Sequence, residues 1–327
     1  MGTKGTQRKS PARKTKETVQ PPPTSWWNSD VAKAVIAAVA TILAATLPIV
    51  VKSIVDRPAV TPSPSPSQTS QSAPVDLAVT SISNGSCPPD MILIPKGPYI
   101  MGATEEDAMA KERTGETPSH TINLSEYCID RTEVSNRSFA EFIKAKKKNW
   151  AYPAAESDYE LPVVMVTWEE AKDYCEWKGE TTGFTVKLPN EFQWEKAARG
   201  PNGKIYPWGN IWSPELANAE QKQEKFTLLP VDSFALGASD YGVLNMAGNA
   251  AEWVEDWYQE KRYSNILDGQ TDPKAEHLPN GAEKKIVRGG AANSSRIDVR
   301  TTVRLGAYGP YDQRQNIGFR CATDYMP

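Results

Sequence analysis

Few side chains in this sequence are able to carry thiol or imidazole chemistry. The cysteines are Cys87, Cys128, Cys175 and Cys321. There are two histidines, His120 and His277, which excludes a metal site of three imidazoles and leaves little choice for a His-based triad. Glu255 and Asp256 suggest an acid–base pair, but adjacent carboxylates on one element rarely face each other, so solvated or structural roles are favoured.

A long uncharged segment near the start of the chain decides where these side chains lie. Residues 34–51 carry no charge over 18 positions, and with residues 31–33 and 52–55 they suffice to cross a membrane. Trp26 and Trp27 precede this segment as an interfacial aromatic belt would. Most nearby Lys and Arg residues precede it, which places the N-terminus in the cytoplasm. We predict a retained signal anchor at residues 31–55; a cleaved signal peptide and a buried soluble helix are the alternatives.

Composition divides the rest of the chain. Residues 1–30 are predicted to form a basic, disordered cytoplasmic tail, and residues 56–85 a Pro-, Ser- and Thr-rich linker. Residues 1–33 carry a net charge of +5, so with −3 overall the remainder carries −8. Phosphate binding needs a basic face, so this acidic remainder excludes nucleic acid as its expected partner. The folded domain is predicted at residues 86–327, on the periplasmic or extracellular side.

Short elements and frequent turns are expected in the folded part. Strands are predicted at residues 91–94, 121–124 and 286–288. Helices are predicted to begin near Ser135, at Thr167, and after Pro189. At Thr167 the sequence T-W-E-E offers a capping box with Glu170. The remaining sequence is rich in Gly, Pro and Asn and is expected to be mostly loops.

The cysteines are predicted to lie in an oxidising compartment, where an even number suggests two disulfides. Four cysteines allow three pairings, and the residues alone do not choose among them. Free buried thiols are one alternative. A catalytic thiol is the other, and it is disfavoured because no histidine is indicated near Cys321.

Blocks of distinctive sequence follow one another in a fixed order along the folded part. They are residues 91–102, 116–136, 161–179, 187–200, 206–210, 230–257, 286–290 and 316–322. With GVLNMAGNAAEWVEDW (242–257), IVRGG (286–290) and NIGFRCA (316–322), the chain from Cys87 onward resembles the formylglycine-generating enzyme, or sulfatase-modifying factor, family. Enzymes of that family oxidise a cysteine in newly made sulfatases.

The resemblance implies the fold and the disulfides. It implies an α+β class: a compact mixed fold with little regular secondary structure, distantly similar to C-type lectin domains and here preceded by one transmembrane helix. It favours a disulfide between Cys175 and Cys321, which leaves Cys87 to pair with Cys128.

The resemblance also implies two structural calcium sites. One would be formed by Asn245, Gly248, Ala250 and Glu252, and the other by Asn218, Ala219, Asp232 and Phe234. Calcium takes six to eight oxygen ligands, which mixed carboxylate, amide and main-chain oxygens can supply. The alternative is that Asn245 and Asn249 are turn residues that bond to the main chain.

The reactive positions of the family are changed in this chain. Counted from the Gly-Gly pair at 289–290, its two reactive cysteines fall on Ser294 and Val299. Copper(I) prefers thiolate ligands, so copper is not expected here. Ala291 replaces the serine that follows Gly-Gly, and Ala251 replaces the aromatic residue of the N-A-W-E-W block. We therefore predict that the fold is retained and the chemistry lost, and we assign no catalytic residue.

A polar ligand cleft is still expected where the copper site would be. Its predicted lining is Asn293, Ser294, Arg296, Asn316 and Arg320, with Asp298 beside them. Surface-loop positions are the alternative for Asn293, Ser294 and Arg296, and a structural salt bridge is the alternative for Arg320. Together these features predict a membrane-anchored, extracytoplasmic, non-catalytic module that binds an unidentified protein, peptide or glycan. The alternative is a family oxidoreductase with a thiol-independent site; formylglycine generation itself is disfavoured by the missing thiols.

Overall fold

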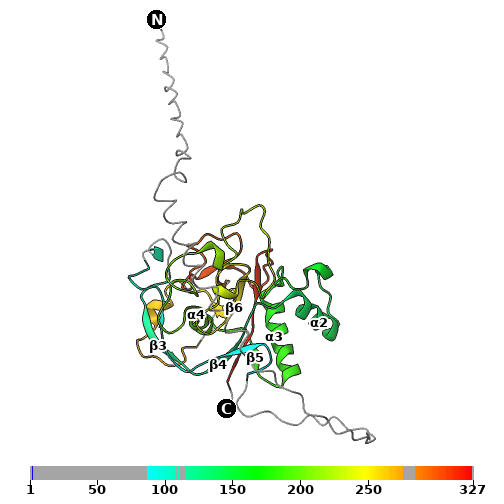
Figure 1. Ribbon diagram of the computed structural model, residues 1–327, viewed down its shortest axis with the longest axis horizontal. Coiled ribbons are helices and arrows are strands. Elements are labelled where there is room, and N and C mark those ends of the chain that lie inside the picture. Colours follow the sequence, from blue (N-terminus) through cyan, green and yellow to red (C-terminus); the bar gives the residue numbers. More distant parts are fainter. Residues whose placement is uncertain (1, 3–86, 108, 111–114, 275–283, 326–327) are drawn as a thin grey trace, which may run out of the picture. The chain divides into compact units, whose positions relative to one another are not determined.

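The computed structural model describes residues 2, 87–107, 109–110, 115–274 and 284–325 (Figure 1). The chain divides into two units, Met1–Leu77 and Ala78–Pro327, and the fold described below belongs to the second. Apart from Gly2, the predicted tail, anchor and linker lie outside the described residues. Within the described ranges, no helix combines the length and apolar character needed to span a membrane.

The described strands form three small sheets. They are β1 (Met91–Ile94), β2 (Gly97–Met101), β3 (His120–Leu124), β4 (Tyr127–Asp130), β5 (Val186–Lys187), β6 (Ala251–Trp257), β7 (Lys285–Arg288), β8 (Leu305–Tyr308), β9 (Ile317–Phe319) and β10 (Ala322–Asp324). The sheet orders are β1-β4-β10-β5, β2-β3 and β8-β7-β6-β9. In the last sheet β6 pairs antiparallel with β7 and parallel with β9, which brings the three blocks of the family signature side by side.

The predicted helices begin where their capping residues indicated. Ser135 caps α2 (Asn136–Lys146), and Thr167 forms a capping box with Glu170 at the start of α3 (Trp168–Thr182). Helix α4 (Glu191–Arg199) starts with a second capping box, and all nine of its residues are buried. Figure 1 shows α4 within the domain, while α2 and α3 lie together at one side of it. The short 3-10 helices are Glu156–Asp158, Pro214–Leu216, Ala235–Gly237 and Tyr263–Asn265.

Buried arginines are paired with carboxylates throughout the core. The pairs are Arg199–Glu195, Arg288–Glu195, Arg300–Asp107, Arg300–Glu116, Arg304–Glu191 and Arg320–Glu252. A buried charge without a partner costs several kcal/mol, so each arginine and its carboxylate partner must be retained together. They link α4 and β6 to the C-terminal third of the chain.

Two disulfides close the domain. Cys87 is joined to Cys128 in β4, and Cys175 in α3 is joined to Cys321, with Cα–Cα distances of 5.7 and 5.6 Å. This is the pairing that the resemblance favours. The second bond closes a loop of 146 residues, for which the chain-entropy account gives a stabilisation of about 5 kcal/mol. All four cysteines of the sequence are used, so none remains as a thiol.

Candidate functional site

Ser294 and Val299, to which the resemblance assigns the family's reactive cysteines, both lie beside Gly290. A β-carbon placed on Gly290 would lie 2.8 Å from Val299 Cγ1 and 3.2 Å from Ser294 Cβ. Both side chains therefore pack against the same main-chain carbon. Gly290 has a φ of +66°, a conformation that favours glycine and holds the turn in place.

Neither position offers a ligand for a soft metal. Val299 is fully buried in an apolar cluster with Ile205 and Tyr206. Ser294 Oγ accepts a hydrogen bond of 2.9 Å from the main-chain N–H of Ala291. Copper(I) requires thiolate or thioether ligands, and no thiol remains in the chain. The residues at this turn do not fit the family's copper ion.

A shallow groove of about 450 Å³ opens at Asn293, the residue before Ser294. Its lining is Met165, Gln223, Phe226, Asn293, Tyr308, Gln313, Arg314, Gln315 and Asn316. Five of these nine side chains are carboxamides. The groove adjoins a second hollow of about 470 Å³, which shares Gln223, Phe226 and Gln315 with it.

Three of the carboxamides are held in a directional relay. Asn316 Nδ2 donates to Asn293 Oδ1 at 2.9 Å, and Asn293 Nδ2 donates to Gln223 Oε1 at 3.0 Å. Gln223 Nε2 donates back to the main-chain oxygen of Asn293 at 2.7 Å. Each bond fixes which end of a carboxamide is the donor, so the relay orients these side chains before any ligand arrives.

The structure brings together only part of the predicted cleft. Asn293 and Asn316 line the groove, whereas the hydroxyl of Ser294 is turned to the main chain. Arg296 is exposed, and its main-chain oxygen accepts a hydrogen bond from Tyr206. Arg320 is fully buried against Glu252 and does not line the groove. A guanidinium buried beside β6 needs a carboxylate partner, and Glu252 is that partner. Arg320 therefore forms the structural salt bridge that was the alternative to a role in the cleft.

Several groove residues were missed from the sequence. Gln313 and Gln315 lie in the run QRQN that ends at Asn316, and this cluster of amides beside a predicted site residue was the available signal. Gln223 and Phe226 belong to a distant loop whose approach to the groove is a tertiary contact without a local sequence signal.

At the first predicted calcium site, the polar side chains already have partners. Glu252 Oε2 accepts hydrogen bonds from Arg320 Nε and Trp194 Nε1, both at 2.7 Å, and Oε1 accepts from Arg320 Nη2 at 2.7 Å. Asn245 donates to Glu133 at 2.8 Å and to the main-chain oxygen of Val231 at 2.9 Å. Calcium takes six to eight oxygens, and both carboxylate oxygens of Glu252 already accept hydrogen bonds, so a bound ion would have to share them.

The second predicted calcium site is similarly engaged. Asn218 Nδ2 donates to Thr227 and Asn249, and its Oδ1 accepts from Gln221. Asp232 is exposed, beside a separate hollow of about 370 Å³. Phe234, Asn245 and Asn249 have positive φ values, as turn residues do. Among the described residues, no group of three His, Cys, Asp or Glu side chains is placed to hold a metal. Calcium at both sites stays a prediction.

Glu133 gives the fold a pH dependence. Burial raises its pKa from 4.5 to about 7, with Arg320 opposing and Glu252 adding to the shift. Between pH 4.5 and about 7 the folded chain holds a proton that the unfolded chain has lost, so its contribution falls as pH rises through this window. We expect the urea-derived free energy of unfolding to fall from pH 5 to pH 7.5. Because burial also raises the pKa of Asp256 to about 7, Glu133→Gln should remove part of that slope. The exposed control Glu105→Gln should keep it; an unchanged slope in Glu133→Gln would contradict the assignment.

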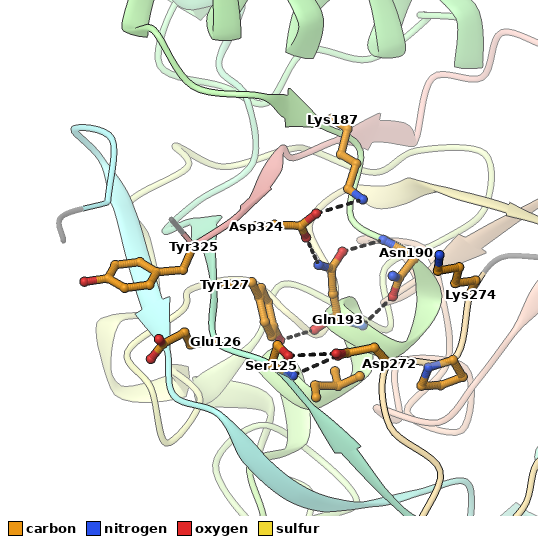
Figure 2. A pocket seen from close by; sticks show the side chains of 12 residues that line it. Ser125, Glu126, Tyr127, Lys187, Asn190, Gln193, Asp272, Lys274, Asp324 and Tyr325 are labelled. Carbon is orange, nitrogen blue, oxygen red and sulfur yellow. Dashed lines mark hydrogen bonds and ion pairs between the residues drawn. The ribbon is translucent and has the colours of Figure 1, made fainter. Parts of the chain in front are cut away.

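Another cavity, of about 330 Å³, lies at the turn between β3 and β4 (Figure 2). Ser125 donates its main-chain N–H and its hydroxyl to Asp272, at 2.8 and 2.7 Å. Asp324 accepts a bond from Gln193 at 3.2 Å and lies 3.5 Å from Lys187, as Figure 2 shows. These contacts tie the turn, the start of α4 and the end of β10 together, which indicates a structural role.

The three small sheets, the capped helices and the two disulfides define an α+β domain of the formylglycine-generating type. Residues 79–325 match the sulfatase-modifying factor enzyme 1-like domain, so the chain belongs to the formylglycine-generating enzyme–sulfatase family.

Both active and inactive members are among its relatives. It is 28% identical over 295 residues to the mouse protein named inactive C-alpha-formylglycine-generating enzyme 2, covering 72% of this chain and 86% of that protein. It is 28% identical over 300 residues to the formylglycine-generating enzyme of Thermomonospora curvata, covering 72% and 93%. The solved structure of PvdO from Pseudomonas aeruginosa shares the fold, with a TM-score of 0.62 at 24% identity over 75% of this chain and all of that one.

Proposed function

We propose that this chain is a membrane-anchored, extracytoplasmic member of its family that binds a ligand in the carboxamide groove and does not generate formylglycine. One observation carries the proposal: every cysteine of the chain is in a disulfide, so Ser294 and Val299, the positions that the resemblance assigns to the family's thiols, have no thiol to replace them. Membership does not decide the activity, because one similar protein is named inactive and another is named an enzyme.

The anchored, extracytoplasmic location has separate support. The apolar segment within residues 31–55 has the length and the flanking charges of a signal anchor. Disulfides persist in oxidising compartments, so the two disulfides of the domain agree with a location outside the cytoplasm. The linker at residues 56–85 would hold the domain away from the bilayer.

The catalytic part is tested by a conversion assay on the full chain. The chain, copper, oxygen and a peptide containing Cys-x-Pro-x-Arg would be incubated together and the peptide read by mass spectrometry. We expect no formylglycine, beside conversion by the Thermomonospora curvata enzyme as the positive control. Conversion by the wild-type chain would show that paired thiols are not required and would overturn the proposal.

The membrane part is tested by extraction of host membranes with alkaline carbonate. The full chain should remain with the membrane pellet, and external protease should digest the domain without reaching residues 1–30. A chain lacking residues 31–55 is the control and should be released. Release of the full-length chain would contradict the anchor.

A further inference from the structure

We infer that the groove takes a neutral glycan; this rests on the proposed function, because it names the ligand class of the same groove. The charge of the lining is the first argument. Arg314 is the one charged residue among the nine, and it lies over the ring of Tyr308 at 5.5 Å and 3.6 Å from Asp312. Asp312 and the ring of Tyr308 thus offset part of its charge. The groove offers no carboxylate for a cationic ligand and a single, exposed cation for an anionic one.

The carboxamides supply the second argument. A sugar hydroxyl both donates and accepts hydrogen bonds, and a carboxamide is the side chain that offers both functions in one rigid plane. The relay from Asn316 through Asn293 to Gln223 fixes these planes. The hydrogen bond to Asn293 uses one N–H of Asn316. Among the described residues no donor reaches Asn316 Oδ1, so this oxygen can accept a hydrogen bond from the ligand.

An apolar surface in the groove is the third argument for a glycan. Phe226 and Met165 line the same groove and are half buried. The C–H face of a pyranose ring is apolar, so an aromatic side chain next to fixed amides suits a ligand with one apolar face and polar edges. Tyr308 also lines the groove, and an edge-on contact fixes its ring against that of Trp253, with 6.1 Å between the ring centroids.

The groove is less suited to an extended peptide. Peptides that bind through their main chain add to the free edge of a strand, which presents a run of N–H and C=O groups. Here the lining comes from loops and from the ends of strands: Tyr308 is the last residue of β8, and Asn316 directly precedes β9. Five of the nine lining residues instead carry side-chain amides, which can both donate and accept hydrogen bonds.

The test uses the full chain in a sugar-free detergent, so that no glycoside head group competes. It would be applied to an array of neutral, sialylated and sulfated oligosaccharides, with a Cys-x-Pro-x-Arg peptide as the peptide probe. Hits would be measured by calorimetry. We expect binding of a neutral oligosaccharide, and a loss of about tenfold or more in affinity for Asn316→Ala, because one oriented hydrogen-bonding group is removed.

Two further variants distinguish binding in the groove from binding elsewhere on the protein. Phe226→Ala removes the apolar face without touching the relay and should also weaken binding, whereas Asn265→Ala, an exposed asparagine outside the groove, should not. Peptide binding that Asn316→Ala abolishes, or binding of acidic glycans alone, would overturn the glycan inference and leave a binding groove. Absence of binding to every probe would count against both the inference and the proposed function. Glycan binding unaffected by both groove variants would place the ligand elsewhere.

Discussion

Placing thiols at the two positions that the resemblance assigns to the family's cysteines, by Ser294→Cys together with Val299→Cys, should create a copper(I) site. Both side chains lie close to Gly290, because a β-carbon placed there would be 3.2 Å from Ser294 Cβ and 2.8 Å from Val299 Cγ1, so we expect the two sulfurs to come within reach of one ion. Two thiolates form a soft ligand pair that copper(I) prefers, whereas a hydroxyl and an isopropyl group do not. The expected change is from no measurable copper to about one ion per chain.

Competition against a copper(I) chelator would measure this, with each single variant as the matched control. One thiolate cannot form the two-sulfur site, so both single variants should bind far more weakly than the double variant. Peptide mapping must show that Cys87–Cys128 and Cys175–Cys321 are intact in every variant. Copper binding by the wild-type chain, or none by a correctly folded double variant, would mean that these positions do not form the site.

Copper binding by the double variant is not expected to bring full turnover. Ala251 and Ala291 still replace the aromatic residue and the serine that the resemblance places in the family's site, and both are buried. A bound metal would therefore lack its surrounding side chains. Copper binding without turnover in the double variant would therefore show that the remaining side chains of the site are needed in addition to the metal.

The sequence predicted the elements whose signals are local. Ser135 and Thr167 cap their helices because a side-chain oxygen can satisfy a free N–H within three residues, which depends only on neighbouring positions. The strand at residues 286–288 was likewise found from its own residues. The two-residue strand Val186–Lys187 was missed, because it forms only through pairing with β10, far away in the chain.

The same distinction holds for the site. Asn293 and Asn316, which were selected because they lie in or beside recognised sequence blocks, both line the groove. Gln223 was not selected, because its role depends on a loop that closes over Asn293 from about seventy positions away. Arg320 was predicted to line the cleft only because it lies in the same sequence block as Asn316. Its actual position follows from the burial of Glu252, which no local pattern reveals.

The buried pair of Arg320 and Glu252 should be the most sensitive electrostatic contact of the fold. Both side chains are almost fully buried, joined by two hydrogen bonds of 2.7 Å. Arg320→Met leaves the carboxylate of Glu252, and that of Glu133 nearby, without their cation. Removing one partner of a buried pair costs about 3–5 kcal/mol. The control Arg137→Met breaks an exposed pair with Glu160 and should cost far less, because solvent screens that pair.

Urea unfolding of Arg320→Met, of Glu252→Leu and of the variant that combines them completes the measurement as a double-mutant cycle. The combined variant should be more stable than Arg320→Met alone, because no uncompensated carboxylate remains at position 252. The same cycle run with calcium and with EDTA tests the predicted ion. Calcium bound at Glu252 would supply the missing positive charge, so it would restore Arg320→Met but not the combined variant. A loss that is the same in calcium and in EDTA would show that Arg320 alone balances Glu252, which is the arrangement that the hydrogen bonds describe.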